Sequence, residues 1–369
     1  MPSVIVVGGG VIGCATAYYL ARDGADVTIM ERGDVSGEAS GAAAGVLATL
    51  SDHGAHPPFF NRLCEDSLRL FDELLPVLAE TGVDVRHRSV GLLEPAVAES
   101  EIADLEAQFE RHKAHAGVRW LDGAEARSLE PGLSSRTRAA ILTPATRYLD
   151  PQRLTQAFAA AARREGVTIR EHEAVTRFMR RGDRLRGVLT ANGTYEADEI
   201  IIAGGPWTTA LANRLGANIP VRPVRGQMMS LESPETGLRH IISGARALLV
   251  PREDGQTYVG ATVEEAGYRK HTTAAGLRGL RAGGAAIVPA LENAKLRRAW
   301  AGLRPATPDG LPVMGRLPGW RNAWVSSGHF RTGILLSPVS GRLLAQAIAA
   351  GREDALPREL APARFSQTA

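Results

Sequence analysis

The stretch that decides the fold is SVIVVGGGVIG, residues 3–13. It opens with a largely β-branched run, typical of a buried parallel strand, and continues into the glycine pattern G-x-G-x-x-G. Residues 11–22 have the apolar spacing of a helix that ends at Gly24, and residues 26–30 form a second strand-like run. Strand, glycine turn, helix and strand in this order predict a βαβ unit that binds a dinucleotide at its first turn.

Each position of the glycine motif has a physical reason. Gly8 permits a tight turn, Gly10 lets a pyrophosphate approach the backbone, and Gly13 lets the helix pack closely on the strand. The N–H groups and positive dipole end of the helix then face the phosphates. Glu31 ends the second strand, where its carboxylate can accept hydrogen bonds from a ribose with a free 2′-hydroxyl, which disfavours NADP. A purely structural turn would explain the glycines alone, but not the strands, helix and acid in register with them.

The composition is that of an ordinary globular protein. The chain has 369 residues, of which 44% are apolar and 22% charged, and this predicts two or three domains. Two cysteines, Cys14 and Cys64, are too few for a disulfide framework or a cysteine-rich zinc site. Of the 43 basic residues only Lys113, Lys270 and Lys295 are lysine, so the arginine excess reflects mainly compositional bias. Without a long basic block, we expect no nucleic-acid partner.

The sequence contains no obvious targeting or membrane segment. Its apolar stretches fall short of the roughly 18 residues that a transmembrane helix needs. The apolar N-terminus lacks the basic region of a signal peptide. We therefore expect a cytoplasmic protein without stable membrane association, and assembly into a homo-oligomer is left open.

Later segments first repeat the alternation of strand and helix. A strand at 199–203 leads into the glycine turn 204–206 and a helix over 207–215, and a last helix covers 335–350. Helical spacing also occurs at 62–80, 99–116 and 151–165, whereas strand-like runs bounded by Gly, Pro and Asp occupy 224–231, 245–250 and 256–263. Parallel pieces at the start, middle and end, with antiparallel material between them, predict two interleaved domains.

A small-residue segment favours a flavin over a nicotinamide. Residues 40–45 read SGAAAG, and such side chains let the backbone approach a flat ring closely. A flexible loop is the alternative on composition alone. Together with the N-terminal position of the first motif and the second glycine turn at Gly204, the segment favours FAD bound along its length.

Motifs near the C-terminus carry a specific resemblance. AGLRP at 301–305, TPDGLP at 307–312 and GHFRTGILL at 328–336 resemble the FAD-dependent D-amino-acid and amine oxidase family. The last of these, GHFRTGILL, is most similar to the glycine oxidase branch of the family, the bacterial enzymes associated with thiamine thiazole synthesis. The similarity runs essentially from end to end and includes VPR at 250–252 and GAT at 260–262.

The resemblance implies an α/β fold with two domains. One is a Rossmann-like FAD-binding domain of the glutathione-reductase type. The other is an α+β substrate domain with a mainly antiparallel sheet. We place the FAD-binding domain in residues 1–80, 147–223 and 300–369, and the substrate domain in residues 81–146 and 224–299.

The resemblance also assigns residues to each part of the cofactor. The pyrophosphate end is implied to lie at Gly8, Gly10, Val11, Ile12 and Gly13. The ribose is implied to lie at Glu31 and Arg32 and the adenine at Val175, and Gly204 and Trp207 are implied to bind the cofactor as well. The isoalloxazine ring is implied to lie along Ala39, Ser40, Ala44, Gly45 and Val46, with His329, Phe330, Arg331, Thr332, Gly333, Ile334 and Leu335 around its pyrimidine end.

Two arginines and a leucine are implied at the substrate. Arg304 matches the carboxylate-binding arginine of the family, and Arg331 matches a second arginine nearby. A guanidinium is always charged and binds a carboxylate with two hydrogen bonds, which suits an amino acid. Leu248 stands where glycine oxidases carry a tyrosine, so we expect a substrate larger or more apolar than glycine, such as a D-amino acid or an N-alkyl glycine.

The implied reaction is oxidative deamination. A hydride passes from the substrate carbon to flavin N5, water hydrolyses the imino acid to a 2-oxo acid and ammonia, and oxygen is reduced to hydrogen peroxide. The partners are thus an amino acid and oxygen, and no general base is required. The alternatives are a D-amino-acid dehydrogenase that reduces a quinone and a tRNA-modifying flavoprotein oxidase. For the last, Arg180, Arg181, Arg184 and Arg186 form the best basic cluster, which we interpret instead as a solvated hairpin.

The cysteine positions predict non-covalent FAD. Sarcosine oxidases of the related monomeric type attach flavin through a cysteine late in the chain. Here both cysteines precede residue 65, and Cys14 lies inside the first predicted helix. The scarcity of lysine likewise leaves few candidates for the lysine that those enzymes use toward oxygen.

Overall fold

The computed structural model describes residues 2–50 and 57–365, and its first elements follow the predicted βαβ unit. β1 (Ser3–Val7), α1 (Val11–Arg22) and β2 (Asp26–Met30) have the predicted bounds. Residues in β1 alternate between the two faces of its sheet, because successive strand side chains point to opposite sides. Val4 and Val6 join one buried cluster, and Ile5 and Val7 join another.

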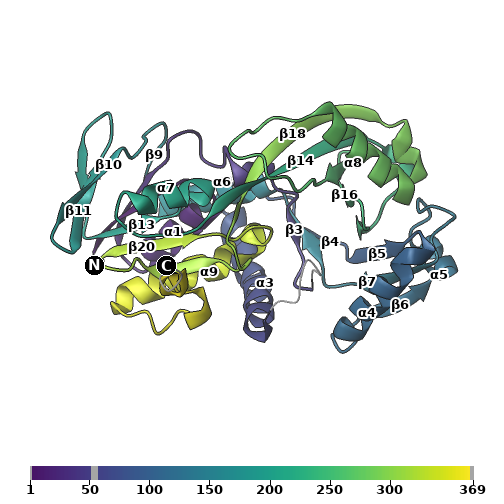
Figure 1. Cartoon of the computed structure of the whole chain (residues 1–369), viewed down its shortest axis with the longest axis horizontal. Helices are drawn as coiled ribbons and strands as arrows, with labels where there is room; N and C mark the ends of the chain where they lie inside the picture. The colour runs from purple at the N-terminus through teal and green to yellow at the C-terminus, as the bar shows by residue number, and fades with distance from the viewer. Residues whose placement is uncertain (1, 51–56, 366–369) are drawn as a thin grey trace.

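This first sheet has six strands in the order β19-β20-β13-β1-β2-β9. All neighbours pair in parallel except β19 and β20. The strands added to β1 and β2 are β9 (Thr168–Arg170), β13 (Glu199–Ile202), β19 (Val313–Arg316) and β20 (Ala323–Ser327). Segments from the start, middle and end of the chain therefore build one sheet, and both termini lie in this lobe (Figure 1).

Helices cover one face of this sheet, and a helix with a small sheet covers the other. The first cluster joins α1 to α3 (Pro58–Ala79), α6 (Pro151–Arg164) and α9 (Gly333–Ala350). The second cluster includes residues of α7 (Thr208–Asn213) and β11 (Arg184–Leu189). β11 pairs with β10 (Arg177–Arg181) and β12 (Thr194–Glu196).

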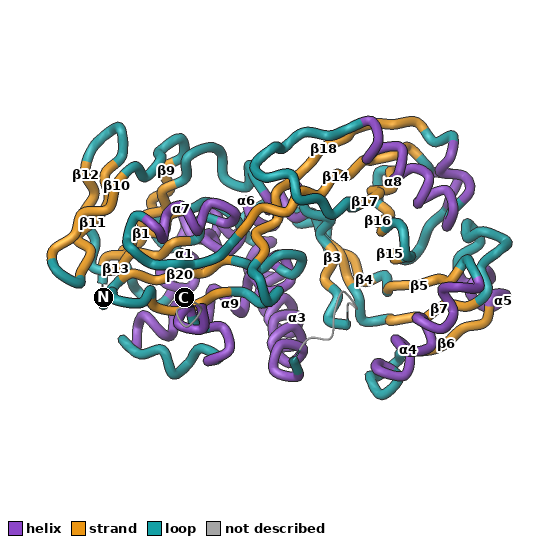
Figure 2. The backbone as a smooth tube through the Cα atoms, in the orientation of Figure 1, coloured by secondary structure: helices purple, strands orange, loops and turns teal. Residues whose placement is uncertain are grey.

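The second lobe contains an eight-stranded, mainly antiparallel sheet in the order β18-β14-β17-β16-β15-β5-β7-β6. Only the β15–β5 pair is parallel. Its strands are β5 (Leu92–Ala96), β6 (Arg119–Asp122), β7 (Ala139–Thr143), β14 (Arg222–Glu232), β15 (Ile241–Ser243), β16 (Leu248–Pro251), β17 (Gln256–Gly260) and β18 (Lys295–Ala306). Its helices are α4 (Ile102–His112), α5 (Gly123–Leu129) and α8 (Ala274–Ile287). Figure 2 shows β14 and β18 running from the junction of the lobes into this sheet.

Short elements join the two lobes. α2 (Ala39–Ala42) is followed by β3 (Val46–Leu47), which pairs with β8 (Arg147–Tyr148). The other edge of β8 pairs with β4 (Arg88–Ser89). The predicted fold class, parallel α/β combined with antiparallel sheet, is confirmed. The residue boundaries of the two domains stay a prediction, and β14 and β18 each run across one of them.

Several predicted elements end elsewhere than expected. The helix over 207–215 is a 3₁₀ turn followed by α7, and the helix over 99–116 shortens to α4. The strand at 245–250 begins only at Leu248, because Gly244 N–H bonds the Ala247 carbonyl in a turn. The segment at 40–45, for which a loop was the alternative, begins within the short helix α2.

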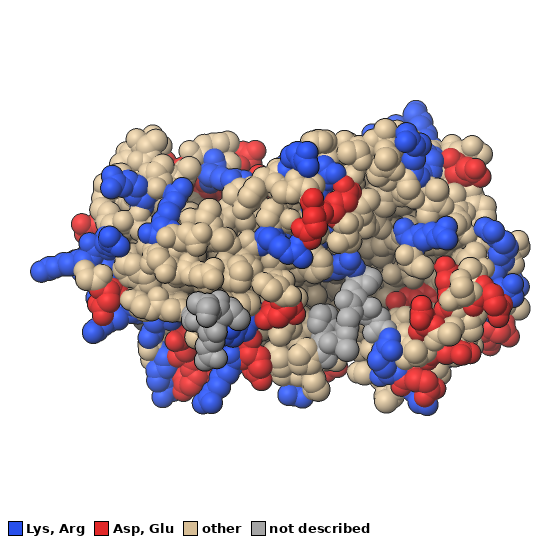
Figure 3. Space-filling view, viewed as in Figure 1, with Lys and Arg blue, Asp and Glu red and all other residues tan. Residues whose placement is uncertain are grey.

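Charged residues are intermixed on the face in Figure 3, with no extended field of one sign. The basic cluster at 180–186 lies on the β10–β11 hairpin, as predicted. Within the described residues α9 is the one helix long and apolar enough to span a membrane, and two thirds of it is buried inside the protein.

The crossing of α1 and α9 offers a stability test. A Cβ added at Gly341 would lie 2.8 Å from the Ala15 carbonyl carbon, closer than packed atoms allow. We expect Gly341→Ala to lower the Tm by about 5 °C, because overpacking strains both helices. The matched control is Gly279→Ala in α8, where an added Cβ meets nothing within 4 Å. That change should leave the Tm unchanged or raise it, since alanine favours helix. Equal Tm changes in the two variants would contradict the packing account.

Candidate active site

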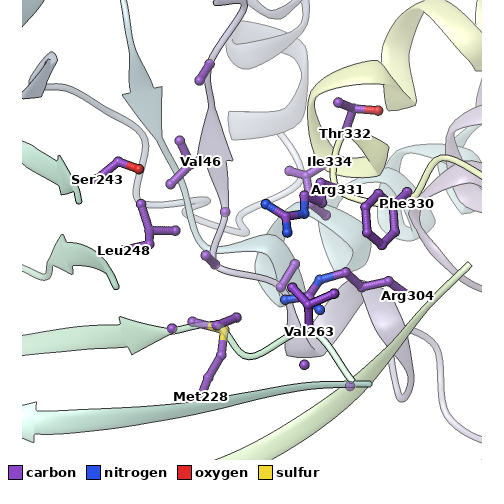
Figure 4. Close-up of a pocket in the computed structure, with 18 of the residues that line it drawn as sticks. Val46, Met228, Ser243, Leu248, Val263, Arg304, Phe330, Arg331, Thr332 and Ile334 are labelled. Atoms are coloured by element: carbon purple, nitrogen blue, oxygen red, sulfur yellow. The ribbon is translucent and has the colours of Figure 1, made fainter. Parts of the chain in front are cut away.

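A cavity of about 470 Å³ opens where the two lobes meet (Figure 4). Its walls come from the segment around α2 and β3, from β14, β16 and β18, and from the start of α9. Eleven residues predicted for the flavin ring and the substrate line it: Ala39, Ala44, Gly45, Val46, Leu248, Arg304, Phe330, Arg331, Thr332, Ile334 and Leu335. Residues far apart in sequence are thus brought to one space.

Two glycines of the motif, Gly8 and Gly13, leave room only for hydrogen. Gly8 has φ of 123°, and a Cβ there would lie 2.4 Å from the Ala203 carbonyl oxygen. A Cβ on Gly13 would lie 2.0 Å from the Gly8 carbonyl oxygen. The turn at Gly8 is therefore as tight as a dinucleotide site requires. The other glycine turn of the chain, at Gly204, lies directly against it.

The start of α1 is fastened to the segment that lines the cavity. Val11 N–H donates to Ser40 Oγ at 2.9 Å, and a Cβ on Gly10 would lie 3.2 Å from that oxygen. The Ser40 side chain therefore lies at the N-terminus of α1 and is not among the residues that line the cavity. The first turn of α1, which includes Ile12, thus begins beside α2, so a ligand at α1 can continue toward the cavity.

The residues predicted for the adenosine end gather around Glu31. Its carboxylate accepts hydrogen bonds from Gly9 N–H at 2.6 Å and Gly33 N–H at 2.8 Å. Its carbonyl accepts one from Glu173 N–H at 2.7 Å, which brings the segment containing Val175 alongside. These contacts fix the carboxylate at the carboxyl end of β2, where a ribose would meet it.

Arg32 and Trp207 stack beside this carboxylate. The Arg32 guanidinium carbon lies 3.5 Å from the centre of the Trp207 ring, and Arg32 also donates to Glu38 at 3.0 Å. Tyr268 stacks on Trp207 at 5.7 Å between ring centres. Lys270 donates to Glu38 at 2.8 Å, so a loop of the second lobe contacts the nucleotide-binding lobe here.

Arg304 brings a positive charge into the cavity from β18. Its Nη1 donates to the Thr262 carbonyl at 3.0 Å, and within residues 2–50 and 57–365 it forms no ion pair. A Cβ on Gly226, in the neighbouring strand β14, would lie 2.4 Å from its guanidinium. Burial, with help from the charge of Arg331, lowers the pKa of Arg304 to about 10. The group therefore stays cationic at neutral pH and lacks a fixed counter-ion.

Arg331 is the second guanidinium at the cavity. It follows Phe330, whose φ of 47° turns the chain at the entrance to α9. Figure 4 shows its guanidinium near that of Arg304. Among the described residues Arg331 has no carboxylate partner, and burial lowers its pKa. Two unpaired cations in one cavity favour an anionic ligand.

The side of the cavity across from the arginines carries apolar and polar side chains together. Leu248 at the start of β16 and Met228 on β14 lie there, with Ser243 of β15 beside Leu248 (Figure 4). Glu94 of β5 also lines the cavity, whereas Val263 beyond β17 lines it next to Arg304. Leu248 offers no hydrogen-bonding group, so an acidic head group would bind at the arginines and an apolar substituent would contact the side across from them.

His329 lies apart from the cavity. Its imidazole is buried and shares a 2.9 Å hydrogen bond through Nε2 with Ser340 in α9. Burial lowers the pKa of His329 to about 3, so the ring is neutral at physiological pH. The residues that line the cavity do not include His329, and its predicted contact with the flavin stays a prediction.

Some lining residues were not predicted. Met228 and Val263 carry no motif, and their place depends on which strand face meets the other lobe. Gly226 did give a signal, since a glycine inside a strand often marks a close approach of another group. Here that group is the guanidinium of Arg304.

Comparison with known proteins now decides the family. The model of the family described as FAD dependent oxidoreductase, DAO, matches residues 3–347. The chain belongs to this family. Its relatives in the DAO family include a glycine oxidase of Pseudomonas putida, 34% identical over 361 residues that cover 97% of this chain and 98% of the relative.

Solved DAO structures have the same fold. Glycine oxidase from Geobacillus kaustophilus has a TM-score of 0.92 and 32% identity, and the match covers 98% of each chain. Iminodiacetate oxidase from Chelativorans sp. BNC1 has a TM-score of 0.88 and 28% identity, with coverage of 97% of this chain and 98% of that chain. The predicted family, fold class and FAD cofactor are confirmed, and the protein is an FAD-dependent oxidase of amino acids.

The residues present fit FAD. The glycine turn offers the bare backbone that a pyrophosphate needs, and the carboxylate of Glu31 is held where a ribose would lie. Small residues such as Ala44 and Gly45, at the end of the SGAAAG segment, line the cavity. Which individual residues contact the cofactor stays a prediction.

Both cysteines support non-covalent attachment. Cys14 in α1 and Cys64 in α3 are buried free thiols, and burial raises the pKa of each to about 12. Neither supplies a thiolate, and neither lines the cavity. We expect acid precipitation of the yellow holoprotein to release all colour into the supernatant. Absorbance of supernatant and pellet measures this directly, and colour that stays with the denatured protein would contradict it.

Proposed function

We propose that the protein oxidatively deaminates glycine or another small amino acid, with release of a 2-oxo acid, ammonia and hydrogen peroxide. The observation that carries the proposal is the guanidinium of Arg304, which forms no ion pair with any described residue and lines the cavity where the small-residue segment ends. A carboxylate there would form paired, charge-assisted hydrogen bonds in a site of low dielectric. The rest of the substrate would then be held in the cavity by one fixed end.

The chain supplies binding and orientation. Arg304 holds the carboxylate, and Arg331 adds positive charge at the entrance to α9. When bound, FAD supplies the two-electron acceptor for the substrate carbon that carries the amine. The neutral amine provides the electron pair that expels the hydride, so no side chain has to remove a proton first. The neutral, buried His329 is consistent with a site that works without an imidazole base.

The apolar residues across from the arginines support a substrate with a small apolar substituent. Leu248 and Met228 line that side of the cavity, so an alkyl side chain or an N-alkyl group would contact them once the carboxylate is on Arg304. The relatives are named for glycine and for iminodiacetate, which are both amino acids with a carboxylate beside the amine-bearing carbon. A role in thiamine synthesis, implied by the resemblance, stays a prediction.

Arg304→Met tests the carboxylate site. Loss of a charge-assisted pair should raise the KM for the substrate by about 100-fold or more, because the neutral side chain binds no carboxylate. The measurement is a peroxide-coupled assay with glycine, sarcosine and panels of D- and L-amino acids. Arg281→Met in α8 is the control, since Arg281 bonds only the Leu291, Glu292 and Ala294 carbonyls in the described chain. A KM within threefold of wild type in Arg304→Met would overturn the assignment.

Leu248→Tyr tests the apolar side chain across from the arginines. A phenol at this position shortens the space for a substituent and adds a hydrogen-bond donor. We expect the ratio of kcat/KM for glycine to that for a larger D-amino acid to rise by about tenfold. Leu249→Met, at a neighbouring buried position that does not line the cavity, is the control. An unchanged ratio would contradict a role for Leu248 in substrate choice.

The electron acceptor is decided in the same preparation. Oxygen consumption matched by peroxide for each substrate molecule oxidised is the expected result. Negligible peroxide with rapid reduction of a quinone analogue would instead identify a dehydrogenase. Turnover of no amino acid at all would overturn the proposal.

A further inference from the structure

Arg252 joins the two lobes at the wall of the cavity without a counter-ion. It directly follows β16, and a turn that ends at Gln256 fixes its backbone through a 2.8 Å hydrogen bond. Its Nη2 donates to the Ala44 carbonyl at 2.5 Å, and its Nη1 donates to the Leu149 carbonyl at 3.2 Å. Within the described parts of the chain no carboxylate forms an ion pair with it. One planar group thus holds two segments of the opposite lobe.

Two aromatic rings fix the orientation of this guanidinium. Its central carbon lies 4.2 Å from the centre of the Tyr258 ring and 4.9 Å from that of Tyr148. Tyr258 comes from β17, and Tyr148 comes from β8 in the junction between the lobes. Stacking of a planar cation on π-faces stabilises it electrostatically, and the carboxylates of Asp150 and Asp254 add a longer-range attraction although neither forms an ion pair with it among the described residues.

The segment that Arg252 holds is the flavin-side wall of the cavity. Ala44, Gly45 and Val46 line it, and Gly45 has φ of 82°, a conformation that favours glycine. A Cβ on Gly45 would lie 2.0 Å from the Leu149 carbonyl oxygen, the same oxygen that accepts from Arg252. The guanidinium therefore bridges the segment at Ala44 and the segment at Leu149, at the point where the cavity wall turns.

A second contact from the same lobe supports this wall. Trp300 Nε1 on β18 donates to the Ala42 carbonyl at 3.1 Å, and Trp300 packs edge-on against Tyr258 with ring centres 5.1 Å apart. Arg252, Tyr258 and Trp300 form one cluster in the substrate lobe. This cluster holds the carbonyls of Ala42 and Ala44 from outside the lobe that contains them.

We propose that Arg252 is a positioning residue for the flavin ring. It would fix the part of the cavity wall against which the ring lies, because it bridges the Ala44 and Leu149 carbonyls from the other lobe. The inference rests on the proposed placement of the flavin ring in this cavity. The bridge requires the planar fork of a guanidinium. A lysine ammonium on the same stem has no flat face to lie between tyrosines and cannot present parallel donors to two carbonyls.

The test compares Arg252→Met and Arg252→Lys with wild type. We expect both variants to raise the Kd for FAD by about tenfold or more, since each loses hydrogen bonds from a charged donor to the cavity wall. Titration of apoprotein into FAD, followed by flavin fluorescence, measures the Kd. The visible absorption bands of the bound flavin should shift, because the ring environment changes. The KM for the amino acid should stay within threefold, since Arg304 is untouched, whereas kcat falls.

Arg281→Met is the matched control. Arg281 is another partly buried arginine in the same lobe that bonds three backbone carbonyls, but it lies away from the cavity. It should lower the apoprotein Tm while leaving the FAD Kd and the flavin spectrum at wild-type values. Addition of methylguanidinium to Arg252→Ala should restore part of the FAD affinity, and methylamine should not.

Several results would overturn the inference. One is a wild-type FAD Kd and spectrum in Arg252→Met, and another is full rescue by Arg252→Lys, which would show that charge alone matters. If Arg252→Met does not fold, Arg252→Lys carries the test, because it keeps the aliphatic stem and the charge. Failure of the proposed function is distinguishable. If the proposed function is wrong, Arg304→Met leaves the KM unchanged. If only this inference is wrong, Arg304→Met raises the KM while Arg252→Met keeps the wild-type Kd for FAD and the wild-type flavin spectrum.

Discussion

Arg304 carries a positive charge into a cavity where the described residues provide no ion-pair partner. Taking a charge out of water costs several kcal/mol unless other groups compensate, and here one carbonyl and a more distant carboxylate do so in part. That carboxylate, Glu264, is held by Arg225 and by Gln227 at 2.7 Å. Negative charge thus remains near Arg304 without neutralising it, and an anionic ligand would complete the compensation.

The strands that carry this charge also explain why the lobes are interleaved. β14 and β18 pair along their length, and Val224 stands opposite Arg304 in that register. Their far ends belong to the antiparallel sheet, while their near ends reach the nucleotide-binding lobe. Gly302 on β18 has room only for hydrogen, because an added Cβ would lie 2.6 Å from Ala42 Cβ. Close backbone approach between lobes therefore requires small residues on both sides.

Local patterns predicted much of the fold. The first strand, helix and second strand have the predicted bounds. The β-branched runs, the glycine spacing and the glycine that ends the helix are all local signals within about 25 residues. The C-terminal motifs singled out Arg304, and the structure places it on the wall of the cavity. What the sequence could not predict depends on contacts between distant residues. The bond from Arg252 to Ala44 spans 208 positions, and nothing in either local sequence indicates it. The burial of His329 and its hydrogen bond to Ser340 of α9 likewise follow from packing.

Binding of a carboxylate by Arg304 beside the flavin ring would explain most of the site described above. The most direct measurement is titration of the oxidised holoprotein with a simple carboxylic acid such as glycolate, followed through the visible absorption bands of the flavin. We expect a saturable spectral change that is competitive with the amino-acid substrate and is lost in Arg304→Met. A flavin spectrum that does not respond in the wild type, or that responds equally in Arg304→Met, would contradict it.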